Sequence, residues 1–124
     1  MSTSVSEATF TSIVLGSELP VLVHFWAPWC GLCKMVTPLL NHFQTEWEGQ
    51  IRLVDINADE NLRLANTYRL SSLPTLLLFE GGELRQRLET FRSKEDMRQV
   101  LDSFMHQRSL RYEMSPLVRI YPQA

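Results

Sequence analysis

The sequence has only two cysteines in its 124 residues, Cys30 and Cys33. A single close pair cannot provide the disulfide framework that holds small secreted domains together. The remaining candidate roles for the pair are redox chemistry and metal binding. A structural zinc site needs a tetrahedral set of Cys or His ligands. The three histidines, His24, His42 and His106, show no ligand spacing among themselves. We therefore favour redox chemistry and expect neither a metal nor another cofactor.

Long apolar runs and long basic runs are also missing. Apolar runs such as residues 20–23 and 76–79 are far shorter than the roughly 20 residues that span a bilayer. The formal net charge is −2, and no basic run interleaved with aromatics provides the charge that nucleic-acid binding requires. The first residues lack the basic and apolar segments of a secretory signal peptide. We expect no membrane, no nucleic acid, and a cytoplasmic location.

Strand-like and helix-like segments alternate along the chain, a pattern typical of an α/β layered domain. The run 21–26 is apolar except for His24, which predicts a central strand buried on both faces. Further strands are predicted over residues 51–57, 75–80 and 83–88. Gly81 and Gly82 separate the last two, which favours an antiparallel hairpin.

Apolar residues at intervals of three and four, together with capping residues, predict helices. The predicted ranges are 7–15, 33–48, 61–68 and, after a Ser93 cap, 94–106. We expect Ser6 to cap the first helix and Glu7 to favour its first turn. On the second helix, Met35 is expected to share one buried stripe with Phe43 and Trp47.

The length fits a single compact domain. We assign it to residues 1–106 and treat residues 107–124 as a C-terminal extension of unknown role. Weak alternation over residues 117–121 favours an edge strand or a segment lying on the domain, and a disordered tail is an equal alternative.

The two cysteines lie where the predicted strand 21–26 passes through a turn into the predicted helix. A cysteine at a helix N-terminus faces unpaired N–H groups and the positive end of the helix dipole, which stabilise thiolate over thiol. Cys30 is therefore the expected nucleophile. Cys33, one turn further, lies within disulfide reach and is the expected resolving thiol. Cys30 would attack a disulfide in a client protein, and Cys33 would then resolve the mixed disulfide.

The segment around these cysteines resembles the thioredoxin family, whose motif Trp-Cys-Gly-Pro-Cys-Lys it matches except at Leu32. The resemblance covers about residues 6–105. Further matches are Phe25-Trp26-Ala27, Lys34-Met35, Pro38 and Leu73-Pro74-Thr75.

The resemblance implies a thioredoxin fold, in which a central mixed sheet of about four to five strands carries helices on both faces. It implies an enzyme, a protein-disulfide reductase that acts as a monomer on client proteins with disulfides. An unidentified reductase would supply its electrons.

The resemblance also implies a client-binding surface around the cysteines. Pro74 is expected to follow a cis peptide bond, which places the Leu73 backbone beside the sulfurs, where it can pair with an extended client segment. The remaining residues assigned to this surface are Trp29, Gly31, Leu32 and Thr90. Ser72 and Thr90 stand where many thioredoxins have glycine, so we expect partners to dock differently.

His24 and Asp55 depart from the family pattern in the core. His24 replaces a buried aspartate thought to help deprotonate the second cysteine, and Asp55 replaces a lysine. Because a lone buried charge is costly, we expect the two to pair beneath Cys33. Two interpretations stay open: His24 accepts the Cys33 proton, or it is a core histidine whose hydrogen bonds are satisfied.

Two alternatives to the reductase stay open, and Leu32 suggests the first. It restores an N–H at the helix start, which favours the reduced form and a more oxidising couple, as in a disulfide oxidase or isomerase. The other alternative is a thioredoxin-fold binding module with little redox activity.

Overall fold

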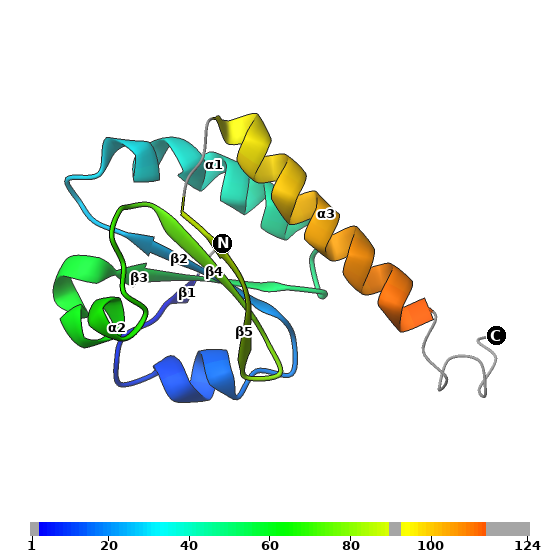
Figure 1. The fold of residues 1–124 in the computed structure, drawn as a ribbon, viewed down its shortest axis with the longest axis horizontal. Helices are drawn as coiled ribbons and strands as arrows, with labels where there is room; N and C mark the ends of the chain where they lie inside the picture. The colour runs from blue at the N-terminus through cyan, green and yellow to red at the C-terminus, as the bar shows by residue number, and fades with distance from the viewer. Residues whose placement is uncertain (1–2, 90–92, 114–124) are drawn as a thin grey trace. The chain divides into compact units, whose positions relative to one another are not determined.

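The structure is a computed structural model that describes residues 3–89 and 93–113. The chain divides into two compact units, residues 1–90 and residues 91–124. The first unit contains the whole described sheet and both cysteines (Figure 1).

The sheet of the first unit is mixed and has five described strands, in the order β1-β3-β2-β4-β5. β2 pairs in parallel with β3, which pairs in parallel with β1, whereas β4 runs antiparallel to both β2 and β5. The bounds are β1 Thr3–Ser4, β2 Val21–Trp26, β3 Arg52–Asn57, β4 Thr75–Glu80 and β5 Glu83–Leu88. The predicted central strand and mixed sheet are confirmed.

The hairpin between β4 and β5 is confirmed as well. Gly81 and Gly82 have φ angles of 62° and 81°. A two-residue hairpin turn that matches the twist of its strands needs positive φ at both positions, and glycine adopts it without steric cost.

Helices lie on both faces of the sheet in this unit, as expected (Figure 1). One face carries α1, and the other carries α2 and the short helix η1. The bounds are η1 Thr11–Leu15, α1 Gly31–Glu46, the 3-10 turn η2 Ala58–Glu60, and α2 Leu62–Thr67.

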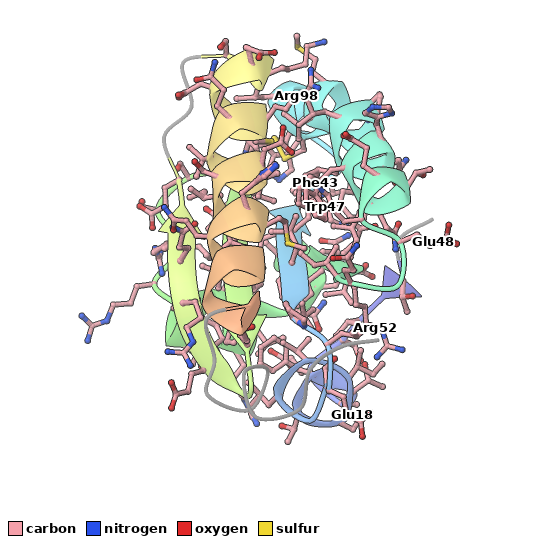
Figure 2. The ribbon with its side chains drawn as sticks, turned by 90° about the vertical axis from the view of Figure 1, so that its right-hand side faces the viewer. Glu18, Phe43, Trp47, Glu48, Arg52 and Arg98 are labelled. Carbon is pink, nitrogen blue, oxygen red and sulfur yellow. A yellow bond between two sulfur atoms is a disulfide. The ribbon has the colours of Figure 1, made fainter. Side chains whose placement is uncertain are left out.

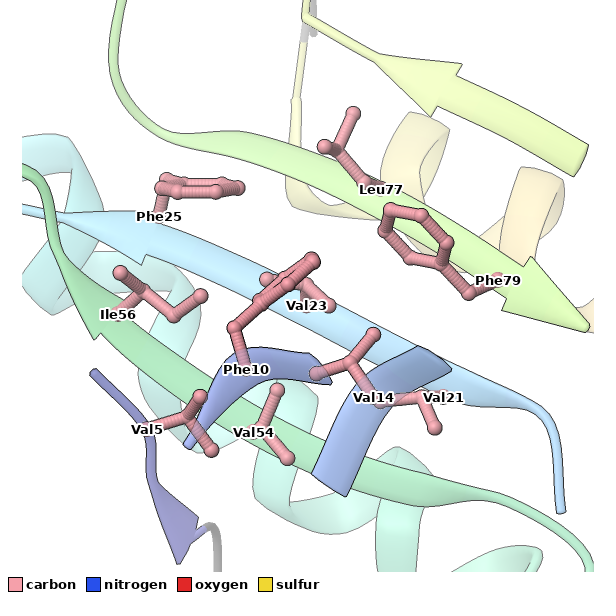
Figure 3. Packing of buried hydrophobic residues seen from close by; sticks show 10 residues of the cluster. All are labelled: Val5, Phe10, Val14, Val21, Val23, Phe25, Val54, Ile56, Leu77 and Phe79. Carbon is pink, nitrogen blue, oxygen red and sulfur yellow. The ribbon is translucent and has the colours of Figure 1, made fainter. Parts of the chain in front are cut away.

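The hydrophobic core on the η1 side of the sheet is built around Phe10 and Val14 (Figure 3). The Phe10 ring meets the ring of Phe79 edge-on at 5.8 Å between centroids, and Tyr68 meets Phe79 at 5.6 Å. Aromatic pairs at these distances add to the stabilisation from burial. The core therefore holds the N-terminal segment against β2 and β4.

The first helix begins later than predicted, and the role expected for Ser6 is wrong. Residues before η1 form a turn in which the Ser6 carbonyl accepts from the Thr9 N–H at 3.1 Å. The Thr9 hydroxyl accepts from the Ser6 N–H at 3.1 Å, so Thr9 and not Ser6 supplies the side-chain oxygen. The role expected for Glu7 is also wrong, since its carboxylate binds α2.

Helix α1 confirms the predicted long helix after the cysteines. Its buried residues are Cys33, Val36, Leu40 and Phe43. Met35 is 55% exposed, so its place on the buried stripe is wrong. Residues four apart are rotated by about 40° on a helix, and Met35 therefore lies about 80° from Phe43. Phe43 and Trp47 lie one turn apart at the C-terminal end (Figure 2).

The second unit contains α3, Lys94–Glu113. Its first turn is capped as predicted, because the Asp96 N–H donates to the Ser93 hydroxyl at 3.1 Å. The helix continues past the predicted end at residue 106, since neither glycine nor proline interrupts residues 107–113. Its buried side chains repeat at helical spacing: Met97, Leu101, Phe104 and Met105. The predicted strand over residues 117–121 lies outside the described residues.

In the part of the chain that the structure describes, no helix is both long enough and apolar enough to cross a membrane.

Candidate active site

Cys30 and Cys33 form a disulfide at the point where the chain passes from β2 into α1. Their Cα atoms are 5.3 Å apart. A turn between strand and helix, closed by the Cys30 N–H and the Ala27 carbonyl at 3.0 Å, presents the first cysteine. Cys30 has an extended backbone and occupies the N-cap position of α1.

The Cys30 sulfur takes the place of a capping oxygen. It accepts a hydrogen bond from the Cys33 N–H, with the nitrogen 3.1 Å from Sγ. This N–H belongs to the first helical turn, whose donors have no partners within the helix. The first turn of α1 carries no acidic residue. A negative charge on Sγ of Cys30 is therefore stabilised by the N–H donor and by the helix dipole.

Both cysteines are buried in this disulfide form, with Cys30 5% and Cys33 2% exposed. They cluster with Ala27, and Trp26 and Leu73 pack against the cluster. Trp29, the residue before Cys30, is by contrast 69% exposed. The two cysteines thus differ little in accessibility in the oxidised protein.

The Leu73–Pro74 peptide bond is cis. The fold brings Leu73 from the loop before β4 into contact with the cysteine cluster. The Thr75 hydroxyl, fully buried at the start of β4, donates to the Ser72 carbonyl at 2.7 Å and holds this loop. The cis bond and the packing of Leu73 against the cysteines are thus observed, and the pairing of the Leu73 backbone with a client segment stays a prediction.

A groove of about 230 Å³ is lined by Trp29 and by Leu73, which packs against the cysteine cluster, and we name it the Trp29 groove. Its walls include Trp29, Asp59, Leu62, Ala65 and Leu73. The Trp29 indole N–H donates to Oδ2 of Asp59 at 2.9 Å. Leu62 is 64% exposed.

Three other residues of the predicted client-binding surface do not line the Trp29 groove among the residues described. Gly31 and Leu32 lie in the first turn of α1, where Leu32 is 45% exposed and a Cβ on Gly31 would meet open space. Thr90 lies outside the described residues.

His24 and Asp55 face each other across the parallel strands β2 and β3. His24 Nδ1 lies 3.1 Å from Asp55 Oδ1, and the side chains are 3% and 28% exposed. Both line a cavity of about 290 Å³, together with Cys33, Lys34 and Thr37. The structure therefore brings the predicted pair and the second cysteine to one cavity.

The second ring nitrogen of His24, Nε2, is buried and has no hydrogen-bond partner among the described residues. An unpartnered polar atom in the interior is costly unless a transient partner satisfies it. This atom therefore has an unused hydrogen-bonding position among the described residues.

No group of three or more His, Cys, Asp and Glu side chains within residues 3–89 and 93–113 is arranged to hold a metal ion. His42, weighed above as a ligand, is exposed on α1, with its Nε2 3.5 Å from Glu46 Oε1.

Sequence reasoning missed Asp59 and Leu62. Asp59 lies in a polar stretch with no apolar periodicity, and only the fold shows that it meets Trp29. Leu62 resembles any apolar residue of an amphipathic helix until its exposure is known.

Comparison with known proteins gives consistent matches. Residues 1–103 match the family model described as Thioredoxin. A protein named Thioredoxin from Synechocystis sp. (strain ATCC 27184 / PCC 6803 / Kazusa) is 51% identical over 79 residues, which are 64% of this chain and 74% of that protein. Thioredoxin 1 from Nostoc sp. (strain PCC 7120 / SAG 25.82 / UTEX 2576) is 48% identical over the same shares. Thioredoxin M5, chloroplastic, from Oryza sativa subsp. japonica is 37% identical over 80% of this chain and 58% of its own length.

Proposed function

The chain belongs to the thioredoxin family and is a thiol–disulfide oxidoreductase of the protein-disulfide reductase class, and we propose that Cys30 is its nucleophile and Cys33 its resolving thiol. The observation that carries this assignment is the hydrogen bond from the Cys33 N–H to the Cys30 sulfur at the N-cap of α1. The same bond and the helix dipole stabilise a Cys30 thiolate once the disulfide is reduced.

The proposed reaction moves two electrons from the cysteine pair to a client disulfide. The Cys30 thiolate attacks one client sulfur, which forms a mixed disulfide and releases the other client sulfur as a thiolate. Cys33 then loses its proton, and its thiolate attacks Sγ of Cys30. The Cys30–Cys33 disulfide closes, and the client leaves with its second sulfur reduced and protonated.

The loop of Leu73 and Pro74 and the Trp29 groove form the proposed client-binding surface. Leu73 packs against the cysteine cluster, so a client strand paired with its backbone would bring a disulfide to Cys30. Gly31 and Leu32 border the sulfur from α1, and Thr90 is included on the basis of the family resemblance.

His24 is the proposed acceptor of the Cys33 proton, and Asp55 its partner. The shared cavity and the unpartnered Nε2 atom support this role. The Asp55 carboxylate at Nδ1 stabilises the imidazolium that forms when Nε2 takes a proton.

The proposed partners are client proteins with disulfides and a reductase that restores the dithiol. We propose a monomer in the reducing environment of the cytoplasm, although the rice relative carries the word chloroplastic in its name. Residues 1–106 are the proposed catalytic domain, and residues 107–124 an extension.

Reduction of insulin by dithiothreitol, followed as turbidity, tests the assignment. The wild-type protein should accelerate the reaction, and Cys30→Ser should return it to the uncatalysed rate. Cys33→Ser should retain clients on Cys30 as mixed disulfides. A wild-type protein no faster than Cys30→Ser would instead favour the binding module.

A further inference from the structure

Helix α2 depends on an acceptor from outside its own segment. It has six residues, Leu62–Thr67, and none of them is fully buried. A helix this short is unstable alone, and its first N–H groups need acceptors. Asn61, at the N-cap position, makes no capping bond with its side chain. Its amide oxygen accepts from the Glu7 N–H at 2.9 Å, and its amide nitrogen donates to the Asn57 carbonyl at 2.9 Å.

The missing cap comes from Glu7 in the N-terminal segment. Its Oε2 atom accepts from the Arg63 N–H at 2.7 Å and from the Leu64 N–H at 3.2 Å. A carboxylate in this position combines charge-assisted hydrogen bonds with a favourable interaction with the helix dipole.

The bonds from the Glu7 carboxylate to α2 form one branch of a hydrogen-bond network. A second branch starts at the Glu7 main-chain N–H, passes through Asn61 and ends at Trp29. Asn61 binds the Asn57 carbonyl, and Oδ1 of Asn57 accepts from the N–H groups of Asp59 and Glu60 at 2.9 and 3.3 Å. This 3-10 turn positions Asp59, whose Oδ2 accepts from the Trp29 indole N–H.

The two branches end on residues that line the Trp29 groove. One fixes α2, which contributes Leu62 and Ala65, and the other fixes Asp59 and Trp29. We infer that Glu7 is a positioning residue for client binding, because its carboxylate holds α2 in place along this groove. Its main-chain N–H, which binds Asn61, leads to Asp59 and Trp29 and does not depend on the side chain. This inference rests on the proposed role of the Trp29 groove. It adds Glu7, near the N-terminus, to the residues on which client binding depends.

The experiment compares a protein substrate with a small one. Glu7→Ala should raise KM for insulin roughly three- to tenfold, the effect expected from losing a helix cap, and leave kcat within about twofold. The rate with 5,5′-dithiobis(2-nitrobenzoate), a small disulfide that does not need the groove, should stay unchanged.

Two further variants separate the capping contact from a general effect of mutation. Glu7→Gln keeps an oxygen that can accept from Arg63 and Leu64, so it should restore most of the lost affinity. Glu48→Ala removes an exposed carboxylate after α1 and should leave both substrates unaffected.

Amide hydrogen exchange shows whether the cap alone has been lost. In Glu7→Ala, the amides of Arg63 and Leu64 should exchange faster, while those of β2 keep their wild-type rates. Faster exchange with an unchanged KM for insulin would overturn the inference, as would equal losses with both substrates. A wild-type protein that reduces neither substrate would overturn the proposed function instead.

Discussion

At the scale of single residues, the chemistry depends on which atom occupies the N-cap of α1. A sulfur at this position receives the hydrogen bond that a serine or aspartate oxygen usually receives. The disulfide and the mixed disulfide carry no charge on that sulfur, whereas the reduced form does. The helix therefore stabilises the reduced state, and so contributes to the reduction potential.

We expect Leu32 to give this chain a different reduction potential from thioredoxins that have proline at the same position. Leucine supplies an N–H in the first turn of the helix that Cys30 caps, and proline has none. Leu32→Pro should therefore lower the reduction potential, by an amount on the order of 30 mV for one lost interaction of about 1.4 kcal/mol. Equilibration with glutathione buffers measures the potential. A variant with a higher potential than the parent would contradict this prediction.

If His24 accepts the Cys33 proton, its contribution to the rate should be largest at pH values too low for a thiol to ionise without a base. His24→Ala should slow insulin reduction near neutral pH by about tenfold or more, and the deficit should shrink as the pH rises. Asp55→Asn should give a smaller change in the same direction.

The matched control for these variants is His42→Ala, which removes an exposed histidine of α1. pH–rate profiles of the four proteins make the measurement. If the profiles of His24→Ala and Asp55→Asn coincide with the wild type, neither residue takes part in the proton transfer.

At the scale of elements, local signals set the ends of some segments and distant contacts set the ends of others. The hairpin turn and the Ser93 cap are local, and both were predicted correctly. Helix α2 is bounded at both ends by distant residues. Glu7 caps its N-terminus, and the Arg87 guanidinium of β5 donates to the Tyr68 carbonyl and, at 2.8 Å, to the Arg69 carbonyl at its C-terminal end.

Alanine substitutions at three glycines distinguish the cost of backbone strain from the cost of a steric contact. Gly49 and Gly82 share a φ of 81°, but only Gly82 has a near neighbour, the Leu15 carbonyl oxygen, 3.1 Å from an added Cβ. Gly49→Ala should cost about 1 kcal/mol of unfolding free energy, and Gly82→Ala more, about 2 kcal/mol. Gly31→Ala, without positive φ or contacts, should be within about 0.5 kcal/mol of the wild type.

Urea unfolding of the three variants under oxidising conditions measures these differences. Equal losses for Gly49→Ala and Gly82→Ala would show that the turn moves away from the Leu15 carbonyl at no cost.

At the scale of the whole molecule, the sites described above belong to the first unit, residues 1–90. The helix of the second unit runs without a break past residue 106, where the sequence predicted that it ends. A helix end predicted where apolar periodicity fades is unreliable, because a helix continues through polar residues until a glycine, a proline or a cap ends it.

The sequence alone determined the features that depend on neighbours along the chain. The strand and helix order, the Gly81-Gly82 turn and the close cysteine pair all follow from short-range spacing and backbone preference. Errors occurred where two local options competed. Ser6 and Thr9 both offered a hydroxyl near the first helix, and Met35 lay near the edge of the buried stripe.

Only the tertiary structure decided which distant side chains meet. The contacts of Glu7 with α2 and of Asp59 with Trp29 each connect segments that are remote in sequence. A hydrogen bond needs its donor and acceptor within about 3 Å and well aligned. That geometry follows from strand register and packing of the folded chain, and no local pattern of residues records it.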